Sequence, residues 1–468
     1  MKKEHFDVVV IGSGPGGEGA AMRLVKGGFS VAIIEKHTRV GGSCTHYGTI
    51  PSKSLRQSIQ SIMEFRRDPF FATAAMQTHV TYQQLLNRAN EIINDQVSLR
   101  IRHYQRNRVP VFTGTASFAD EHTLQITQDD SHQTMLSFDH AVIATGSSPY
   151  HPDDVDFEQA NIVDADSILD LTHTPRSITI YGAGVIGCEY ASIFINLGLK
   201  VNLVNTRDKL LSYLDDEITD ALGYHLREQG VVVRHNEQYQ RVSSEKNRVT
   251  LHCESGKQFT SEYLLWANGR SGNAASLNLE ALGVEVNHRE QVIVDQNFQT
   301  AVPHIYAVGD VIGPPGLASA SYDQGRFVGT KIDLGESDWD LIEDVPNGIY
   351  TNPEISSLGA TEKELTDRKV PYDVAHTLFK TIARAQITGR TTGVLKLLFH
   401  RETLEILGIH CFGDNAAEII HIGQAIMRQK GKANSLRYFA ETTFNYPTMA
   451  EAYRVAALNG LNRLDHEE

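Results

Sequence analysis

The fold is decided by the stretch Phe6-Asp7-Val8-Val9-Val10-Ile11-Gly12-Ser13-Gly14-Pro15-Gly16-Gly17, in which an apolar strand runs into a glycine-rich turn and then a helix. Such a turn points free backbone amides and the positive end of the helix dipole at a pyrophosphate, while Gly14 lets the backbone approach it. The returning strand, Val31 to Glu35, ends in a carboxylate that can accept hydrogen bonds from an adenosine ribose and would repel a 2′-phosphate. We therefore expect this unit to bind FAD or NAD(H), and not NADP(H), through Gly12, Gly14, Gly17 and Glu35.

The same unit occurs a second time further along the chain. Its strand is Ser177 to Tyr181, its turn Gly182-Ala183-Gly184-Val185-Ile186-Gly187, and its returning strand Val201 to Asn205. One isolated G-x-G-x-x-G turn is weak evidence, but two copies between strand and helix indicate two nucleotide-binding units. Asn205 stands where the first copy has Glu35, so a phosphorylated ribose is not repelled here. Arg207 either meets that phosphate or is an ordinary solvated loop residue. The predicted contacts of this unit are Gly182, Gly184, Gly187, Asn205 and Arg207.

Length, composition and charge restrict the kind of protein. A chain of 468 residues is too long for one core and indicates roughly two to four domains. Hydrophobic residues make up 41%, and no apolar run approaches the ~20 residues of a membrane span, so no membrane partner is expected. A formal net charge of -14 argues against nucleic acid, which requires a basic footprint. Four cysteines without a regular framework favour a reducing compartment, and the expected location is the cytoplasm.

Two longer motifs connect the sequence with a known family: Gly41-Gly42-Ser43-Cys44-Thr45-His46-Tyr47-Gly48-Thr49-Ile50-Pro51-Ser52-Lys53 and His304-Ile305-Tyr306-Ala307-Val308-Gly309-Asp310. With them the chain resembles the flavoprotein disulfide reductases from end to end. The resemblance implies FAD on the first unit, a nicotinamide nucleotide on the second, and a C-terminal interface domain that forms a homodimer or higher homo-oligomer. It places Asp310 at the flavin ribitol. It also implies cofactor contacts where the chain leaves the two units, at Thr145, Gly146 and Gly269.

The expected fold class is α/β, with two Rossmann-like nucleotide-binding domains, for FAD and NAD(P), and a C-terminal α+β dimerisation domain. In the family the motif that ends at Asp310 returns to the flavin, so the FAD-binding domain is expected in two segments, residues 1–147 and 270–340. Residues 148–269 would form the NAD(P)-binding domain, and residues 341–468 the dimerisation domain.

Two departures from the family pattern bear on the chemistry. The disulfide chemistry of the family needs one cysteine that attacks the substrate and a second that contacts the flavin. Cys44 is present, but Thr49 stands at the flavin-side position and cannot carry an electron pair. The family also uses a histidine from the partner subunit as a base. Here that position is Tyr446, a poor base near neutral pH, although Glu451 is retained.

With the thiol machinery disabled and both nucleotide units retained, hydride exchange at the flavin remains. The motifs around Cys44 and Tyr446 are similar to those of a branch of the family that moves hydride between nicotinamide nucleotides. We therefore expect reversible transfer between NADPH and NAD+ through FAD, with one nicotinamide site used twice and no redox disulfide. The family match places Lys53 and Glu189 in an ion pair near the flavin, where a cation stabilises charge on the ring. Cys44 and Thr49 are expected to contact the cofactor.

Plainer interpretations remain open for several of these features. Glu189 can be an ordinary carboxylate favoured by the helix dipole, and Cys188 is better explained as a small packing residue than as a reactive thiol. Rival functions are a flavin NAD(P)H oxidase or diaphorase, and a non-catalytic subunit that binds nucleotides. No metal site is expected, because the neighbouring pairs lack the spacing of a zinc site, namely Cys44 with His46, His252 with Cys253, and His410 with Cys411.

Overall fold

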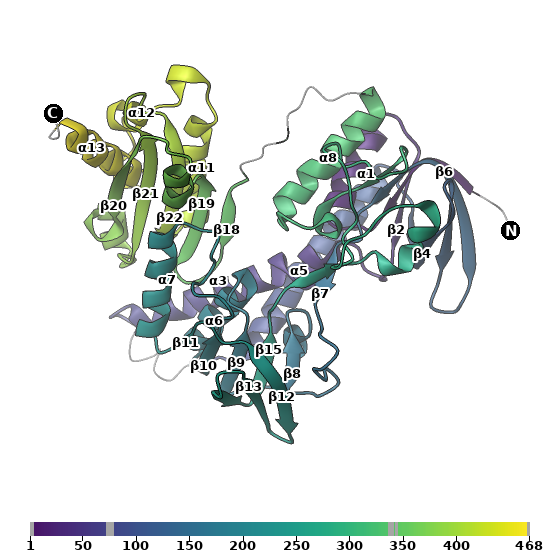
Figure 1. Ribbon diagram of the computed structural model, residues 1–468, viewed down its shortest axis with the longest axis horizontal. Coiled ribbons are helices and arrows are strands. Elements are labelled where there is room, and N and C mark those ends of the chain that lie inside the picture. The colour runs from purple at the N-terminus through teal and green to yellow at the C-terminus, as the bar shows by residue number, and fades with distance from the viewer. Residues whose placement is uncertain (1–3, 72–78, 336–340, 342–344, 466–468) are drawn as a thin grey trace.

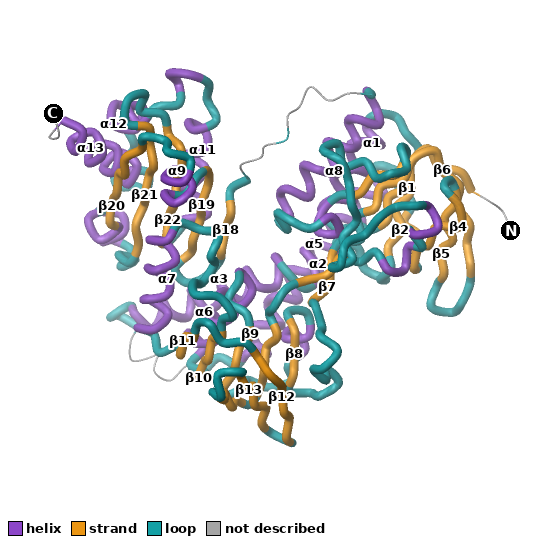
Figure 2. Tube along the Cα trace, viewed as in Figure 1, coloured by secondary structure: helices purple, strands orange, loops and turns teal. Residues whose placement is uncertain are grey.

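The computed structural model describes residues 4–71, 79–335, 341 and 345–465 (Figure 1). Three main sheets organise the chain, and Figure 2 shows their strands with helices packed beside them. The N-terminal and C-terminal sheets lie on opposite sides of the view, with the second sheet below and between them. The fold is therefore α/β with two Rossmann-type sheets and a C-terminal α+β unit. No helix in the described ranges is long and apolar enough to cross a membrane.

The first sheet has seven strands in the order β3-β2-β1-β6-β5-β4, and β17 also pairs with β6. Its central strand β1 is parallel to both β2 and β6. Alternate residues of β1 enter different cores, Val8 and Val10 on one face and Val9 and Ile11 on the other, as expected for a parallel strand covered on both sides. The strands are β1 (Glu4–Ile11), β2 (Val31–Glu35), β3 (Val111–Thr113), β4 (Thr115–Asp120), β5 (Thr123–Thr127), β6 (Gln133–Ile143) and β17 (Ile305–Ala307).

Helices α1 (Pro15–Lys26), α5 (Tyr82–Arg106) and α8 (Ala318–Leu334) cover one face of this sheet. Glycines allow α1 and α8 to touch along their backbones. A Cβ on Gly325 would lie 2.1 Å from the Gly16 carbonyl oxygen, and one on Gly19 would lie 2.5 Å from the Tyr322 carbonyl oxygen. Since α8 follows the 3-10 turn η4 (Gly309–Ile312), this contact draws Asp310 towards the first glycine turn.

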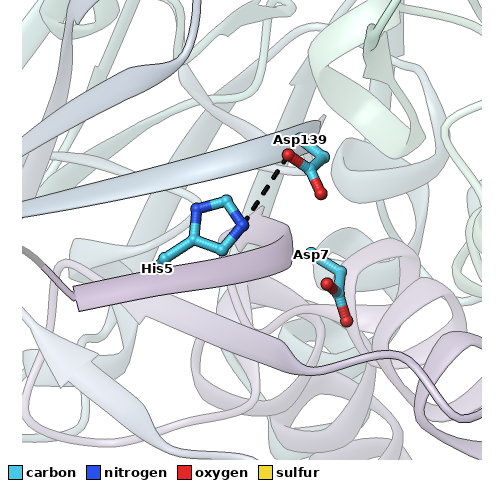
Figure 3. A group of neighbouring side chains, drawn as sticks. All are labelled: His5, Asp7 and Asp139. Atoms are coloured by element: carbon cyan, nitrogen blue, oxygen red, sulfur yellow. Dashed lines mark ion pairs between the residues drawn. The ribbon is translucent and has the colours of Figure 1, made fainter.

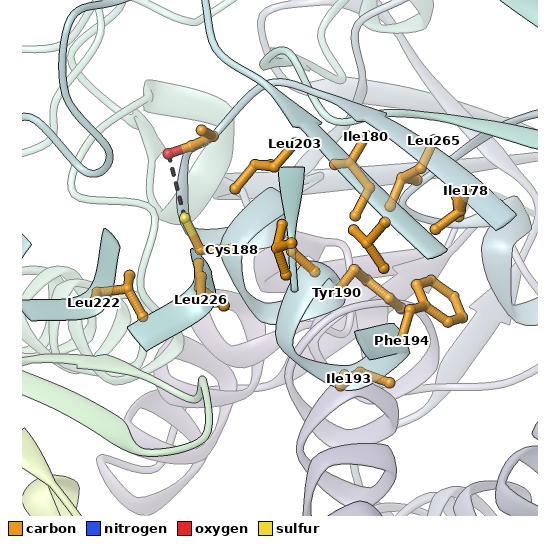
Figure 4. Packing of buried hydrophobic residues seen from close by; sticks show 14 of the residues in the cluster. Ile178, Ile180, Cys188, Tyr190, Ile193, Phe194, Leu203, Leu222, Leu226 and Leu265 are labelled. Atoms are coloured by element: carbon orange, nitrogen blue, oxygen red, sulfur yellow. Dashed lines mark hydrogen bonds between the residues drawn. The ribbon is translucent and has the colours of Figure 1, made fainter. Parts of the chain in front are cut away.

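The second sheet is entirely parallel, in the order β11-β10-β9-β15-β8. Its strands are β8 (Ile162–Asp164), β9 (Ser177–Tyr181), β10 (Lys200–Val204), β11 (Val232–Arg234) and β15 (Tyr263–Trp266). Two helices belong to it, α6 (Val185–Leu197) and α7 (Asp216–Glu228), and a small antiparallel sheet flanks it, β12 (Tyr239–Glu245), β13 (Arg248–Cys253) and β14 (Gln258–Ser261). Cys188 is fully buried in the core shown in Figure 4, where its Sγ donates to the Ala183 carbonyl at 3.5 Å. Burial raises the pKa of this thiol, so Cys188 is a packing residue.

The two glycine turns have the same backbone geometry. Gly12 and Gly182 both have a φ of 107°, a value that L side chains rarely adopt. The third glycines, Gly17 and Gly187, approach the turn so closely that a Cβ would lie 2.0 Å and 1.9 Å from the carbonyl oxygens of Gly12 and Gly182. The repeat seen in the sequence is thus also a repeat in three dimensions.

The chain crosses between the first two sheets through a short antiparallel pair, β7 (Ser147–Pro149) and β16 (Arg270–Gly272). The third sheet is antiparallel, in the order β18-β19-β22-β21-β20. Its strands are β18 (Asn347–Ile349), β19 (Glu354–Gly359), β20 (Tyr372–Leu378), β21 (Gly393–His400) and β22 (Ile406–Gly413). Its helices are α9 (Glu362–Asp367), α10 (Ala383–Ile387), α11 (Ala416–Met427), α12 (Leu436–Glu441) and α13 (Glu451–Asp465).

The contact between α1 and α8 leads to a prediction about stability. Gly325→Ala forces the two backbones apart, so we expect it to lower the free energy of unfolding by about 2 kcal/mol or more. Gly223→Ala in α7 is the matched control, because its Cβ meets the movable end of Arg227 at 3.1 Å and the Leu210 side chain at an ordinary 3.7 Å. Alanine also gains up to about 1 kcal/mol in helix propensity there. Thermal denaturation of both variants checks this, and equal midpoints would contradict it.

Candidate active site

A cavity of about 2240 Å³ lies between the first glycine turn, helix α3 (Thr49–Arg67) and the start of α6. It exceeds the roughly 300–1,000 Å³ of a pocket for one drug-sized molecule, so it has room for more than one extended ligand. Ten of the predicted site residues line it: Gly12, Gly14, Glu35, Cys44, Thr49, Lys53, Thr145, Gly146, Glu189 and Asp310. The remaining seven are not among its lining residues: Gly17, Gly182, Gly184, Gly187, Asn205, Arg207 and Gly269.

Glu35, at the end of β2, is buried and fixes the first glycine turn. Its Oε2 accepts hydrogen bonds from the Ser13 amide at 3.1 Å and from the Ser13 hydroxyl. Its Oε1 accepts from the His37 amide at 3.0 Å. The carboxylate therefore holds the turn and the end of β2 together at the wall of the cavity.

Asp310 enters the cavity from η4 and is tied to the segment after β6. Its Oδ2 accepts from the Ser147 hydroxyl at 3.1 Å, and Arg270 Nε donates to the same hydroxyl at 2.8 Å. Thr145 Oγ1 is buried beside this group and has no hydrogen-bond partner among the described residues. Since an unpaired buried hydroxyl costs ~1–3 kcal/mol, this atom indicates a place where a polar ligand contributes the missing partner.

Lys53 in α3 and Glu189 in α6 form an ion pair between the first two sheets. The Lys53 ammonium lies 2.8 Å from both oxygens of the Glu189 carboxylate. Glu189 also accepts from the Ser52 hydroxyl at 3.3 Å and from the Tyr350 amide at 2.9 Å. Its side chain is 4% exposed, and that of Lys53 is 26% exposed. The carboxylate is therefore anchored, and the ammonium is the partner that remains accessible from the cavity.

Cys44, in the short helix α2 (Gly42–His46), lies beside the residue that replaces the second cysteine. Burial raises the pKa of the Cys44 thiol above its ordinary value, and a hydrogen bond from the Thr49 hydroxyl offsets part of that increase. All four cysteines are free. At this position the site thus holds one thiol next to a hydroxyl, a pair that cannot form a disulfide.

Asn205 lies directly after β10, and its side chain is buried within its own loop. Nδ2 donates to the Lys209 carbonyl at 2.8 Å and contacts His235 Nδ1 at 3.1 Å, while Oδ1 accepts from the Arg207 amide at 3.3 Å. Arg207 is exposed, and its Nη1 donates to the Ser212 hydroxyl at 2.7 Å. The Asn205 side chain therefore holds the backbone of this loop in place, and the Arg207 side chain leaves a positive charge exposed at its surface.

Tyr446 and Glu451 lie at the C-terminal end of the chain, outside the cavity of their own chain. The Tyr446 side chain is 67% exposed, and Glu451 begins helix α13. The family resemblance assigns this motif to the site of the partner subunit.

Figure 3 shows one group of potential metal ligands on the neighbouring inner strands β1 and β6 of the first sheet, His5, Asp7 and Asp139. His5 Nε2 lies 3.7 Å from Asp139 Oδ1. Hydrogen bonds from the Ser30 amide and hydroxyl hold the pKa of Asp7 below its usual value. These groups are solvated and already partnered, and they are not among the cavity-lining residues.

A second group, Asp215, Glu217 and Glu362, surrounds the buried ammonium of Lys396. Lys396 Nζ lies 2.7 Å from Asp215 and 3.1 Å from Glu217. The lysine occupies the space between the carboxylates. These ion pairs connect β21 with the start of α7, so we interpret the group as structural.

Sequence reasoning missed the part of the site that comes from the third sheet. Residues 349–354 touch both α3 and α6, and Tyr350 lines the cavity. The available signal was the run of polar residues around Pro353, Thr351-Asn352-Pro353-Glu354, of which the structure buries Thr351 and Glu354. Polar residues at buried positions require specific partners.

The comparisons with known proteins agree with this architecture. The pattern of the family "Pyridine nucleotide-disulphide oxidoreductase" matches residues 6–325, and that of its dimerisation domain matches residues 345–457. The chain belongs to the pyridine nucleotide-disulphide oxidoreductase family, which confirms the family expected from the motifs.

Within that family, the chain is similar to proteins named soluble pyridine nucleotide transhydrogenase. The one from Vibrio vulnificus (strain YJ016) is 59% identical over 460 residues, 98% of this chain and 99% of the relative. The one from Enterobacter sp. (strain 638) is 57% identical over 459 residues, 98% of each chain.

Solved structures share the fold over nearly the whole chain. The HOCl-induced flavoprotein disulfide reductase RclA from Escherichia coli, solved as a Cu(II) complex, is 28% identical with a TM-score of 0.88, covering 98% of this chain and 99% of its own. LpdA from Mycobacterium tuberculosis, at 24% identity and the same TM-score, covers 97% and 99% and supports the fold alone.

The environment of Cys44 leads to a prediction about its reactivity. Because its pKa is raised, less thiolate is present at pH 7 than for a free cysteine, so alkylation by iodoacetamide is expected to be slow there. The rate should still be rising above pH 9, since a free thiol has a pKa of about 8.5. Mass spectrometry locates the label, and Cys44→Ser is the control because the other three cysteines are buried. A rate that levels off below pH 8 would contradict this prediction.

Proposed function

We propose that this chain is a flavoprotein that transfers hydride reversibly between NADPH and NAD+, with bound FAD and without a redox disulfide. The observation that carries the proposal is the pair at the thiol site: Cys44 has the Thr49 hydroxyl beside it instead of a second thiol. A disulfide relay is thereby removed, while the Lys53–Glu189 ion pair and the large cavity are present. The names of relatives 59% identical over nearly the full chain support the same activity.

The residues around the first glycine turn fit FAD. In this proposal Gly12, Gly14 and Gly17 admit the pyrophosphate, and Glu35 accepts hydrogen bonds from the adenosine ribose. Asp310 binds the ribitol, and the unpaired Thr145 hydroxyl gains a partner. Thr145, Gly146, Cys44 and Thr49 border the remaining space. When bound, FAD supplies an isoalloxazine ring that can accept a hydride and return it.

Lys53 and Glu189 are the residues to which we assign a role in the reaction. The ammonium is held by both carboxylate oxygens at 2.8 Å, so its position is fixed before any substrate binds. A preorganised positive charge stabilises negative charge that develops during hydride transfer. Glu189 acts as the anchor that keeps this charge in place.

The reaction balances without a proton or an external oxidant. NADPH loses a hydride from its nicotinamide and leaves as NADP+, and NAD+ gains a hydride and leaves as NADH. We propose that both nucleotides use one nicotinamide site in turn, on the second unit, with Gly182, Gly184 and Gly187 at the pyrophosphate. Gly269, which has a φ of 106°, lies where the chain leaves that unit.

We propose the same division of the chain as the sequence suggested. Residues 1–147 and 270–340 form the FAD-binding domain, which the pairing of β17 with β6 supports. Residues 148–269 form the NAD(P)-binding domain and residues 341–468 the dimerisation domain, supported by the dimerisation-domain match. The assembly is a homodimer or a higher homo-oligomer. Four free cysteines support a cytoplasmic location.

The proposed activity is tested by mixing the yellow protein with NADPH and then with NAD+ in a stopped-flow instrument. We expect the flavin absorbance to fall and then recover as NADH forms, with lipoamide and glutathione disulfide giving no turnover. Cys44→Ser should retain most of the hydride transfer, since no electron pair passes through sulfur. Peroxide formation in place of NADH would identify an oxidase. Substantial disulfide reduction, or a flavin that NADPH does not bleach, would also overturn the proposal.

If one site binds both NADP(H) and NAD(H), the loop after β10 should distinguish them by the 2′-phosphate. Arg207→Ala is expected to lower kcat/KM for NADPH about tenfold, or ~1.4 kcal/mol, because an exposed charge loses its contact with the 2′-phosphate. The value for NADH with a dye acceptor should stay unchanged. Lys209→Ala is the matched control, since that lysine is paired with Asp216 at 2.7 Å. Equal losses with both nucleotides would remove Arg207 from the specificity site.

A further inference from the structure

The segment 349–354, which we call the strap, crosses from β18 to β19 of the third sheet and lies against helix α3. Arg56 in α3 holds it at two points. The Arg56 guanidinium lies 2.8 Å from the Glu354 carboxylate, with both side chains buried, and Arg56 Nε donates to the Thr351 carbonyl at 3.3 Å. The strap is thereby fixed to the helix that carries Lys53.

The strap is fixed to helix α6 as well. The Asn352 amide donates to the Ser192 hydroxyl at 2.8 Å, and the Tyr350 amide donates to Glu189 Oε1 at 2.9 Å. Ser192 and Glu189 are three residues apart and therefore share a helix face. Arg56 and Lys53 have the same spacing in α3. The strap thus binds α3 within one helical turn of Lys53 and α6 within one helical turn of Glu189.

Tyr350 touches both members of the ion pair. Its backbone amide donates to the Glu189 carboxylate, and its ring centroid lies 4.8 Å from the Lys53 ammonium. This distance is within the ~6 Å over which an aromatic face attracts a cation. Gly348 leaves the ring free to take this position, because a Cβ there would lie 3.1 Å from the Tyr350 ring. The ring is therefore a second support for the ammonium besides the carboxylate.

We propose that Tyr350 is a positioning residue for hydride transfer. It comes from the third sheet and contacts the Lys53–Glu189 ion pair, which lies between the first and second sheets. Its amide fixes the direction of the Glu189 carboxylate, and its ring keeps the Lys53 ammonium against that carboxylate. The inference rests on the proposed function, because it assumes that the ammonium acts during hydride transfer. It adds that the C-terminal sheet contributes a residue to the pair from within the same chain.

The test compares Tyr350→Leu, which removes the aromatic face, with Tyr350→Phe, which keeps it. The limiting rate at which NADPH bleaches the flavin is separated from the NADPH dissociation constant by varying NADPH. We expect Tyr350→Leu to lower the limiting rate by about fivefold to thirtyfold, the range of ~1–2 kcal/mol for a cation over a ring, and to change the dissociation constant little. Tyr350→Phe should remain close to the parent. If Tyr350→Leu does not retain flavin, Tyr350→Met gives the same comparison.

A double-mutant cycle with Lys53→Met distinguishes positioning from a general structural role. If Tyr350 acts through Lys53, Tyr350→Leu should cause no further loss of rate once Lys53 is methionine, whereas additive losses would overturn the inference. The midpoint potential of the bound flavin gives a readout independent of turnover. It should become more negative in Tyr350→Leu and in Lys53→Met alike, and an unchanged potential in Tyr350→Leu would count against the inference. If NADPH fails to bleach even the parent, the proposed function fails instead.

Discussion

The backbone at Gly12, in the first glycine turn, has no room for a side chain, and the arrangement of the cavity depends on that constraint. A Cβ on Gly12 would lie 2.2 Å from the Ala144 carbonyl oxygen, so the end of β6 passes directly over the turn. Backbone hydrogen bonds of 2.8 Å tie Gly12 to β2 and Ala144 to β1. One turn therefore sets the position of Glu35 on one side and of Thr145 on the other. The contact of α1 with α8 then adds Asp310 to the same wall.

The fold could be predicted because its deciding signals are local. A glycine turn between an apolar strand and a helix is contained in about a dozen residues, and its two copies fold alike. The site was predictable only as far as such motifs extend: Lys53 and Glu189 do form an ion pair. Tyr350 was missed because its place depends on how a third, distant sheet docks. That Asn205 faces a ribose stays a prediction; the structure adds a contact of its side-chain amide with His235, a residue on another strand end that no local pattern connects with it.

The replacement of one thiol changes what the rest of the site can do. With a second cysteine in place of Thr49, electrons would leave the flavin through sulfur towards the far side of the site. With the Thr49 hydroxyl beside Cys44 that route is closed, so in the proposed reaction the hydride leaves from the place where it entered. In the proposed reaction both nucleotides therefore exchange hydride at the same site next to the flavin. The loop after β10 must then bind the adenosine ribose of NAD(H) and the 2′-phosphorylated ribose of NADP(H) alike.

The contact between α1 and α8 also has a consequence for how the chain is made. The end of β6 pairs with β17, and Val8 and Val10 share a core with Val328 of α8, yet both partners are synthesised only after the whole second sheet. At about 5–20 residues per second, the emerging chain waits on the order of ten seconds for them. During that interval an open parallel edge and an apolar face are exposed, the conditions under which strands pair wrongly. The glycines that let α8 pack onto α1 therefore complete the first sheet and its helical cover only after the second sheet has been synthesised, although the first sheet is begun earlier.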